Sequence, residues 1–526
     1  MSVVSVVSVV RVASTPSLSR APGAVRNTPP PKASRVSATH SDPAFTRAAD
    51  ALMARGPGRM VPDLDRITAL AGLLGDPQLA YPSVHVTGTN GKGSVVRMVG
   101  ALCAAAGLSA GTFTSPHLQS VRERLSLAGR HISEARFAEI HDEVATLAGL
   151  LDEQAGPDGD TVTFFEMLTA MAYWYFADAP VDVAVLEVGM GGTWDATNLV
   201  RGDVAVISAI DVDHSELGDT PEQVAGEKAG IIKPGGHVVI GRQRPEVLQV
   251  LEQAAAEADA AHVHLLGQDL EVVERRIAVG GQQLTLRVGD RTVDDVLLPL
   301  FGAHQADNAA LALGAFAALT GVALESMDDE VIRHGLGAVA VPGRLEVVHR
   351  DPTVVLDGAH NPHGARAAAA AVGEAFEFRD LVLVVACLED KDVEGILGGL
   401  RDLAAHVVVT RAPSPRAASL ERMHRAATGV WGDTGVPVEA AEDLDTALEL
   451  AERLGSEGDG VLVAGSLLAV GAARDRYLPV TDPGDEVVYE PDDLDEDEHT
   501  PLDEHELEQT SDREAFGDAL NRMLDD

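Results

Sequence analysis

Seven consecutive residues in the first quarter of the chain have the composition of a loop that binds phosphate. They are Gly88, Thr89, Asn90, Gly91, Lys92, Gly93 and Ser94. Glycines let backbone N–H groups turn toward a phosphate, a lysine neutralises its charge, and a following helix adds the positive end of its dipole. An apolar run at residues 84–86 precedes the loop and a helical pattern at residues 95–106 follows it. We therefore predict a nucleotide site rather than a glycine-rich turn with a solvated lysine, although Gly93 interrupts the usual G-x-x-x-x-G-K-[ST] pattern.

Other short motifs follow this loop in an order that resembles the dihydrofolate synthase/folylpolyglutamate synthase family of Mur-type ligases. These motifs lie at residues 111–118, 122–124, 186–192, 195–198, 227–233, 342–344, 356–362 and 390–392. Their joint order is far more specific than any one of them. The resemblance implies an ATP-dependent ligase that joins L-glutamate to dihydropteroate, to folates, or to both, through an acyl phosphate.

The resemblance also implies which residues contact ATP and which act in the transfer. Besides the loop from Thr89 to Ser94, the ATP contacts would be Asn308, Arg344 and Asp357. A planar guanidinium can stabilise charge that develops on a phosphoryl group, so Arg344 is assigned to the γ-phosphate. An interdomain salt bridge is the alternative role for this arginine. The implied catalytic residues are Lys92, Lys228, Arg344 and His360, and Ser466 lies with His360 on the glutamate side.

A magnesium site is expected beside the phosphates. Glu187 ends an apolar run at the carboxyl end of a predicted strand, where α/β folds place their ligands. On residue type alone, Glu187 also fits a carboxylate paired with a lysine, and His214 also fits an ordinary loop histidine. The resemblance implies that Ser115, Glu187 and His214 bind Mg²⁺, and that two Mg²⁺ ions are present.

Lys228 would be an exposed helical lysine if its local sequence alone decided its role. The resemblance implies instead that CO₂ carbamylates its amine. Such a modification replaces a cation with an anion that can hold the second Mg²⁺. Only Ser215 and Glu216 separate His214 from Leu217, one residue fewer than this family usually has.

Two aromatic and acidic segments resemble those that contact the pterin ring in dihydrofolate synthases. They contain Thr163, Phe164, Phe165, Glu166, Trp194, Asp195 and Ala196. Aromatic and acidic groups suit a flat heterocycle that forms hydrogen bonds. The two phenylalanines also fit the core at the start of a helix. Thr193 stands where many relatives have an arginine.

The elements that must position these residues are short apolar strands between alanine-rich helices. The apolar runs lie at residues 84–86, 183–186, 204–207, 354–356, 381–385, 407–409 and 461–463. Continuous apolar strands separated by helices indicate parallel sheets covered on both faces. Residues 284–288 alternate instead, which predicts a small antiparallel hairpin. We therefore predict an α/β fold: a P-loop ATPase domain with a mostly parallel sheet and a small antiparallel appendage, followed by a smaller Rossmann-like C-terminal domain.

Composition changes along the chain place four segments. We expect a disordered leader at 1–40, which contains no Asp or Glu, and an acidic disordered tail at 481–526. Between them we expect an ATP-binding Mur ligase-like domain at 41–345 and a glutamate-ligase domain at 346–480.

Charge and cysteine content exclude several classes of protein. The formal net charge of −42 disfavours binding to nucleic acid or anionic lipid. The sequence contains no uninterrupted apolar run of about 18 residues, so no membrane span is predicted. Two distant cysteines, Cys103 and Cys387, indicate a reducing compartment without a disulfide framework. We expect a cytoplasmic monomer.

Two other functions fit part of the sequence. A peptidoglycan Mur ligase would share the chemistry, but it usually has a UDP-binding domain before the phosphate loop, and the segment available here is too short for one. A nucleotide-binding interaction protein with little catalysis would not need Glu187, His214, Lys228 and Arg344 together.

Overall fold

The computed structural model describes residues 41–56, 62–156, 159–212, 215–321, 327–456 and 458–479. The predicted leader and acidic tail lie outside these residues, and so does His214. Within the described residues, no helix combines the length and the apolar character needed to cross a membrane.

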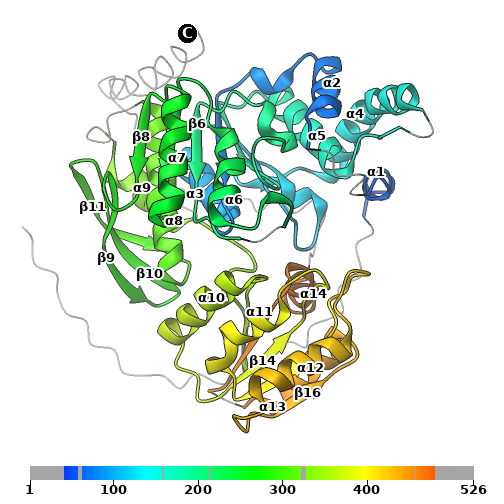
Figure 1. Ribbon diagram of the computed structural model, residues 1–526, viewed down its shortest axis with the longest axis vertical. Coiled ribbons are helices and arrows are strands. Elements are labelled where there is room, and N and C mark those ends of the chain that lie inside the picture. Colours follow the sequence, from blue (N-terminus) through cyan, green and yellow to red (C-terminus); the bar gives the residue numbers. More distant parts are fainter. Residues whose placement is uncertain are drawn as a thin grey trace, which may run out of the picture. The chain divides into compact units, whose positions relative to one another are not determined.

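The first half of the chain is built on an eight-stranded sheet (Figure 1). The strands are β1 (Ser83–Thr87), β2 (Ala110–Phe113), β3 (Leu125–Leu127), β4 (Arg130–His131), β5 (Val183–Glu187), β6 (Val204–Ile207), β7 (His237–Ile240) and β8 (His262–Leu265). Their order is β4-β3-β2-β5-β1-β6-β7-β8. The six neighbouring strands β2, β5, β1, β6, β7 and β8 are parallel to one another. The β3 strand pairs antiparallel with β2, and β4 pairs antiparallel with β3. Every residue of β1 and β5 is buried, as expected of strands in the middle of a parallel sheet, although β1 also contains the polar residues Ser83, His85 and Thr87.

Helices cover both faces of this sheet. They are α1 (Pro43–Ala54), α2 (Asp65–Leu73), α3 (Lys92–Ala105), α4 (Glu134–Ala155), α5 (Phe164–Asp178), α6 (Pro221–Lys228), α7 (Pro245–Glu257), α8 (Ala303–Thr320) and α9 (Asp329–Gly337). Val183 and Val185 pack into the core formed with α3 and α8, and Ala184 and Leu186 pack into the core formed with α4 and α5. This alternation follows from the two-residue period of a strand. Short 3₁₀ turns connect several elements: η1 (Pro77–Leu79), η2 (Val121–Arg124), η3 (Ala196–Leu199), η4 (Ser215–Leu217), η5 (Ala229–Ile231) and η7 (Arg401–Leu403).

The predicted hairpin is part of a three-stranded antiparallel sheet. Its strands are β9 (Leu270–Ala278), β10 (Gly281–Val288) and β11 (Arg291–Leu298), in the order β11-β10-β9. Leu284 and Leu286 are buried in the same core as α3 and α8, so the sheet is attached to the first domain. Charged residues break the apolar pattern of β9, which explains why the sequence did not reveal this strand.

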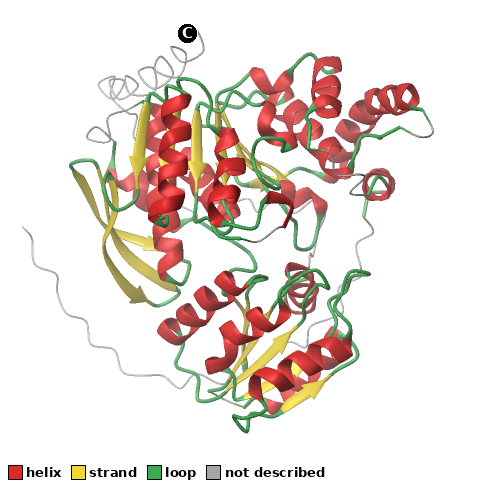
Figure 2. Cartoon of the chain, in the orientation of Figure 1, coloured by secondary structure: helices red, strands yellow, loops and turns green. Residues whose placement is uncertain are grey.

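The second half of the chain forms a six-stranded sheet with helices on both faces (Figure 2). Its strands are β12 (Glu346–Arg350), β13 (Thr353–Leu356), β14 (Leu381–Val385), β15 (His406–Val409), β16 (Val438–Ala440) and β17 (Gly460–Ala464), and its order is β12-β13-β17-β14-β15-β16. Only β12 pairs antiparallel. Its helices are α10 (Pro362–Ala375), α11 (Val393–Leu400), α12 (Leu420–Trp431), α13 (Leu444–Leu454) and α14 (Leu467–Tyr477). The predicted fold class is confirmed.

The packing of α8 generates a stability prediction. Phe316 is completely buried on α8, whereas Leu297 on β11 is 47% exposed. Because truncation of a buried Phe leaves a cavity, we expect Phe316→Ala to lower the free energy of unfolding by about 3–5 kcal/mol. Leu297→Ala should change it by about 1 kcal/mol or less. Chemical denaturation of both variants measures the difference, and equal losses would contradict the central position of α8.

Candidate active site

The phosphate loop lies where three polypeptide segments approach one another closely. It connects the end of β1 to the first residue of α3, Lys92. A Cβ on Gly88 would lie 1.9 Å from Ser208 Oγ, and a Cβ on Gly91 would lie 2.6 Å from Asn308 Oδ1. Both glycines also have positive φ angles, 146° and 90°. Side chains are therefore excluded at both positions by space and by backbone conformation. Ser208 Oγ donates to the Asn90 carbonyl (2.7 Å), which further fixes the loop.

Two lysine ammonium groups converge on one carbonyl of this loop. Lys92 Nζ donates to Gly88 O (3.1 Å), and Lys228 Nζ donates to the same oxygen (3.0 Å). Lys228 is the last residue of α6 and only 4% exposed. The local sequence alone would have made it an exposed helical lysine, and that interpretation is wrong. The two amines concentrate positive charge where the loop would receive phosphate.

Glu187 brings a buried carboxylate to the same loop. The residue ends β5 beside β1, with Glu187 opposite Val86. Ser115 N–H donates to Glu187 Oε2 (2.9 Å), and a Cβ on Gly93 would lie 3.1 Å from that oxygen. Glu187 is 4% exposed, and burial raises its pKa although the charge of Lys92 opposes this effect. The structure therefore places Ser115 and Glu187 together beside the phosphate loop.

These residues fit a magnesium ion. Mg²⁺ prefers oxygen ligands and is usually held by one or two carboxylates together with substrate phosphates and water. Glu187 offers a carboxylate whose charge is disfavoured by burial unless a cation is near. In the described part of the chain, no three His, Cys, Asp or Glu side chains form a ready-made metal centre. The remaining ligands would come from hydroxyl groups such as that of Ser115, and from ATP and water.

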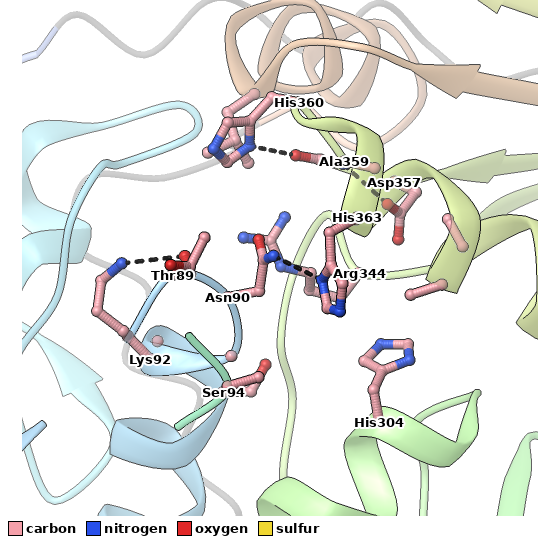
Figure 3. A pocket seen from close by; sticks show the side chains of 18 of the residues that line it. Thr89, Asn90, Lys92, Ser94, His304, Arg344, Asp357, Ala359, His360 and His363 are labelled. Carbon is pink, nitrogen blue, oxygen red and sulfur yellow. Dashed lines mark hydrogen bonds between the residues drawn. The ribbon is translucent and has the colours of Figure 1, made fainter. Parts of the chain in front are cut away.

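The loop opens into a cavity of about 460 Å³ lined by residues from both halves of the chain (Figure 3). The first half contributes Thr89–Ser94, Ser115, Glu187, Gly189, His304 and Asn308, and the second half contributes Arg344, Asp357, His360, His363, Asp390, Lys391, Arg416 and Ser466, among others. Asn90 forms hydrogen bonds with Asn361 Nδ2 (3.1 Å) and with His363 Nδ1 (3.0 Å). The phosphate loop is thus in direct contact with the start of α10.

Arg344 and Asp357 lie on the wall of the cavity that the second half contributes. Among the described residues Arg344 forms no ion pair, so the alternative of an interdomain salt bridge is not observed. Asp357 accepts from Leu345 N–H (3.0 Å) and from Ala359 N–H (2.9 Å). Burial raises the pKa of Asp357, and the charge of Arg344 opposes this rise. Asp357 therefore organises the turn that positions Arg344.

Three histidines line the cavity, and the sequence had singled out only His360. His360 Nδ1 lies 2.9 Å from Gly358 O. A carbonyl only accepts, so Nδ1 carries the hydrogen and a neutral ring presents Nε2 as an acceptor. Burial, with the charges of Arg344 and His363, lowers the pKa of His304 to about 4, so this ring is neutral. His304 precedes Asn308 by one helical turn of α8, and that spacing was the available signal.

The residues expected to contact a pterin do not line this cavity. Thr163 and Glu166 form a capping box at the start of α5, and Glu166 also pairs with Arg66 (3.0 Å). Asp195 is 4% exposed and accepts from Met190 N–H (2.8 Å) and Thr197 N–H (3.0 Å). Both carboxylates therefore have structural roles in this structure.

The aromatic members of the same set lie nearer the cavity. A Cβ on Gly189, which lines the cavity, would lie 2.5 Å from the Phe165 ring. Phe164 and Trp194 are partly exposed, and Ala196 is buried. Ser466, by contrast, lines the cavity and accepts from Leu468 N–H (3.2 Å) at the start of α14.

Known proteins share this combination of domains. A family model described as "Mur ligase middle domain" matches residues 86–316, and one described as "Mur ligase, glutamate ligase domain" matches residues 343–467. The chain is 46% identical over 444 residues to a dihydrofolate synthase/folylpolyglutamate synthase of Mycobacterium tuberculosis, covering 80% of this chain and 91% of that protein. A Bacillus subtilis protein of the same name is 33% identical, covering 79% and 95%.

Solved structures agree with these sequence matches. The folylpolyglutamate synthase of Mycobacterium tuberculosis complexed with ADP has a TM-score of 0.78 and 44% identity, with 82% of this chain and 98% of that chain covered. An FPGS complex with AMPPCP and folate has a TM-score of 0.70 and 30% identity, with 82% and 99% covered.

The two domains and the phosphate loop between them define an ATP-dependent ligase of the Mur type. The extent and identity of the matches are more specific. The chain belongs to the dihydrofolate synthase/folylpolyglutamate synthase family. The family assigned from the sequence motifs is confirmed.

The burial of Glu187 generates a prediction about stability and pH. A carboxyl group whose pKa is raised by folding destabilises the fold as the pH rises from the ordinary carboxyl range through the raised value. Glu187→Gln removes the charge and keeps an oxygen for Ser115 N–H. Without nucleotide, we expect Glu187→Gln to melt at a higher temperature than the original chain at pH 8, and the gap to shrink toward pH 4.

Thermal melting across this pH range, with and without Mg·ATP, makes the comparison. Ligand should stabilise the original chain more than Glu187→Gln, because only the carboxylate attracts a cation. If Glu187→Gln melts at a lower temperature than the original chain at pH 8 without ligand, burial is not what raises the pKa of Glu187.

Proposed function

We propose that this protein joins L-glutamate to the carboxylate of dihydropteroate, and of folates, at the expense of ATP. The observation that carries the proposal is the cavity itself. Lys92 and Glu187 line it from the first half of the chain, and Arg344, His360 and Ser466 line it from the second half. ATP and an amino-acid substrate can therefore meet in one cavity. The names of the relatives supply the substrate class.

The first step transfers the γ-phosphoryl group. An oxygen of the acceptor carboxylate attacks the γ-phosphorus, the bond to the β,γ-bridging oxygen breaks, and ADP leaves. Backbone N–H groups of the phosphate loop and the Lys92 ammonium bind the phosphates. Arg344 would neutralise charge that develops on the transferred group. The product is an acyl phosphate held inside the cavity.

The second step forms the amide. The amine nitrogen of glutamate attacks the acyl carbon, and phosphate leaves with the electrons of the broken C–O bond. A proton must leave the nitrogen, and His360 Nε2 is an acceptor in the neutral ring because Nδ1 donates to Gly358 O. Ser466 lies in the same cavity and would help to orient the amino acid. Substrates that fill the cavity would limit the access of water to the acyl phosphate.

Magnesium would be held by Glu187 and Ser115, and by His214 from outside the described residues. When bound, it would withdraw charge from the phosphate oxygens. We further propose that two ions bind and that Lys228 is carbamylated. The support is the position of Lys228: a buried amine on the phosphate loop carbonyl, which would become an anionic ligand on carbamylation.

The remaining assignments extend the same proposal. ATP would contact Thr89–Ser94, Asn308 and Asp357, all of which line the cavity. The pterin end of the acceptor would approach Phe164, Phe165, Trp194 and Ala196, and Thr163, Glu166 and Asp195 would shape that region. Residues of one chain supply both sides of the cavity, and we propose that the protein acts as a monomer. The net charge of −42 and the two buried free thiols fit a cytoplasmic enzyme without a nucleic-acid partner.

The direct test offers each acceptor separately. Purified protein is incubated with Mg·ATP and labelled glutamate, together with dihydropteroate or tetrahydrofolate. We expect labelled product and stoichiometric ADP with both acceptors. No labelled product with either would contradict the function, and product with one alone would restrict it to that activity.

Lys92 provides the first variant. Among the described residues its ammonium group forms hydrogen bonds only with loop carbonyls, so Lys92→Ala should preserve the fold. We expect at least about a hundredfold loss of turnover because the charge on the phosphates is lost. Thermal melting checks folding, and steady-state assays check turnover. Turnover within about threefold of the original chain would contradict the assignment of the loop.

Lys228 provides the second variant. If Lys228 is a carbamate ligand, Lys228→Ala should lose turnover far more than ATP affinity, and added acetate should restore part of the rate by occupying the vacated space. Lys233→Ala is the matched control, because Lys233 donates to the nearby Asn198 carbonyl (2.9 Å). Acetate should not affect the control. Intact-mass measurement under gentle conditions should show the added carboxyl group, and an unmodified amine in active enzyme would contradict the carbamate.

A further inference from the structure

Arg124 is a buried arginine that the steps above do not use. It ends the turn η2 (Val121–Arg124) and is 7% exposed. Its Nε donates to His117 Nδ1 (2.9 Å), and the guanidinium carbon lies 5.2 Å from the centre of the Phe164 ring. The face of the guanidinium thus packs against an aromatic ring, and one of its N–H groups is satisfied by a histidine.

The other edge of the guanidinium has no partner among the described residues. The Nη1 and Nη2 groups have no hydrogen-bond acceptor there, and no carboxylate lies within 4.0 Å of them. Arg124 is not among the described residues whose unpaired side-chain atoms are fully buried. Its Nη1 and Nη2 groups therefore remain accessible to solvent. Burial lowers the pKa of Arg124 to about 10. Burying a charged group without partners is costly, so a structural role explains Arg124 poorly.

The neighbouring carboxylates are already occupied. Glu123 accepts three backbone N–H groups, from Leu118 (2.8 Å), Gln119 (2.8 Å) and Ser120 (2.7 Å). Glu187 accepts from Ser115 at the phosphate loop. Arg66 shows how the same fold satisfies a half-buried arginine: both oxygens of Glu166 lie 3.1 Å from its Nε.

Residues next to Arg124 in the sequence and in the packing line the cavity or contact residues that line it. Ser115 and Pro116, which precede its partner His117, line the cavity. Phe165, which follows the ring under Arg124, lies against Gly189, another lining residue. Glu187 is the first of the charges that act on Arg124. Arg124 is therefore a cation between the phosphate loop and the aromatic residues expected to contact the acceptor.

We propose that Arg124 binds the carboxylate of the acceptor substrate through its two Nη groups. This inference rests on the proposed function and names a residue for its acceptor subsite. A planar guanidinium binds a carboxylate through two parallel hydrogen bonds, while its face remains on Phe164. The bound carboxylate supplies the acceptors that the fold does not, and it lies on the side of Glu187, where phosphate is transferred.

Arg124→Met and Arg124→Lys test this role, with Arg130→Met as the matched control because Arg130 is an exposed arginine on the adjacent strand β4. We expect Arg124→Met to raise KM for the acceptor at least about tenfold, with KM for ATP and glutamate within about twofold. Arg124→Lys should lie between, because it keeps the charge but not the planar fork. The melting temperature of Arg124→Met should be unchanged or higher, since an unpaired buried charge is removed. The control should match the original chain throughout.

Equilibrium binding separates this inference from the proposed function. The probes are pteroate and the analogue in which hydrogen replaces its carboxylate. Arg124→Met should weaken binding of pteroate about tenfold or more and leave the analogue unaffected. That result without any turnover by the original chain would overturn the proposed function and retain the inference. An unchanged affinity for pteroate, equal losses for both probes, or a lower melting temperature with uniform loss for every substrate would overturn the inference.

Discussion

The close packing of three side chains against the glycines of the phosphate loop is the constraint on which the site depends. Gly88 lies against Ser208 at the end of β6, Gly91 against Asn308 of α8, and Gly93 against Glu187 at the end of β5. No side chain fits at any of these contacts without displacement. The parallel order of β5, β1 and β6 brings the three carboxyl ends to one edge of the sheet. Glycine at these positions therefore lets the Gly88–Ser94 loop pack against the Glu187 carboxylate and the helix α8.

The charges of the site run against those of the whole chain. The protein carries a formal net charge of −42, yet Lys92 and Lys228 meet at one loop carbonyl, and Arg124 and Arg344 act on Glu187 or its neighbours. Burying cations away from water is unfavourable unless anions or hydrogen-bond acceptors replace the lost solvation. In the proposed function, the phosphates of ATP and the carboxylate of the acceptor would be the anions that these cations bind. Glu187 provides the complementary negative charge for a cation.

The sequence predicted the strands and the loop well, because continuous apolar runs and glycine spacing are local signals. It did not predict the pairing of Asn90 with Asn361 and His363, since a contact across about 270 residues of sequence leaves no periodic trace. The local sequence also predicted wrongly that Lys228 is exposed, because a single lysine in a helical pattern does not indicate which other segments bury it. Thr163 and Glu166 could have been recognised as a capping box from their spacing alone. The resemblance to the family had instead predicted that both residues contact the substrate.

Transfer of oxygen from the acceptor to phosphate tests the account most directly. If the carboxylate attacks the γ-phosphorus, one carboxylate oxygen must leave with the phosphate when the amide forms. Acceptor labelled with ¹⁸O in its carboxylate is turned over with Mg·ATP and glutamate, and the released phosphate is analysed by mass spectrometry. The account predicts one ¹⁸O atom in the phosphate for each amide bond formed. Unlabelled phosphate, or label in AMP, would contradict it.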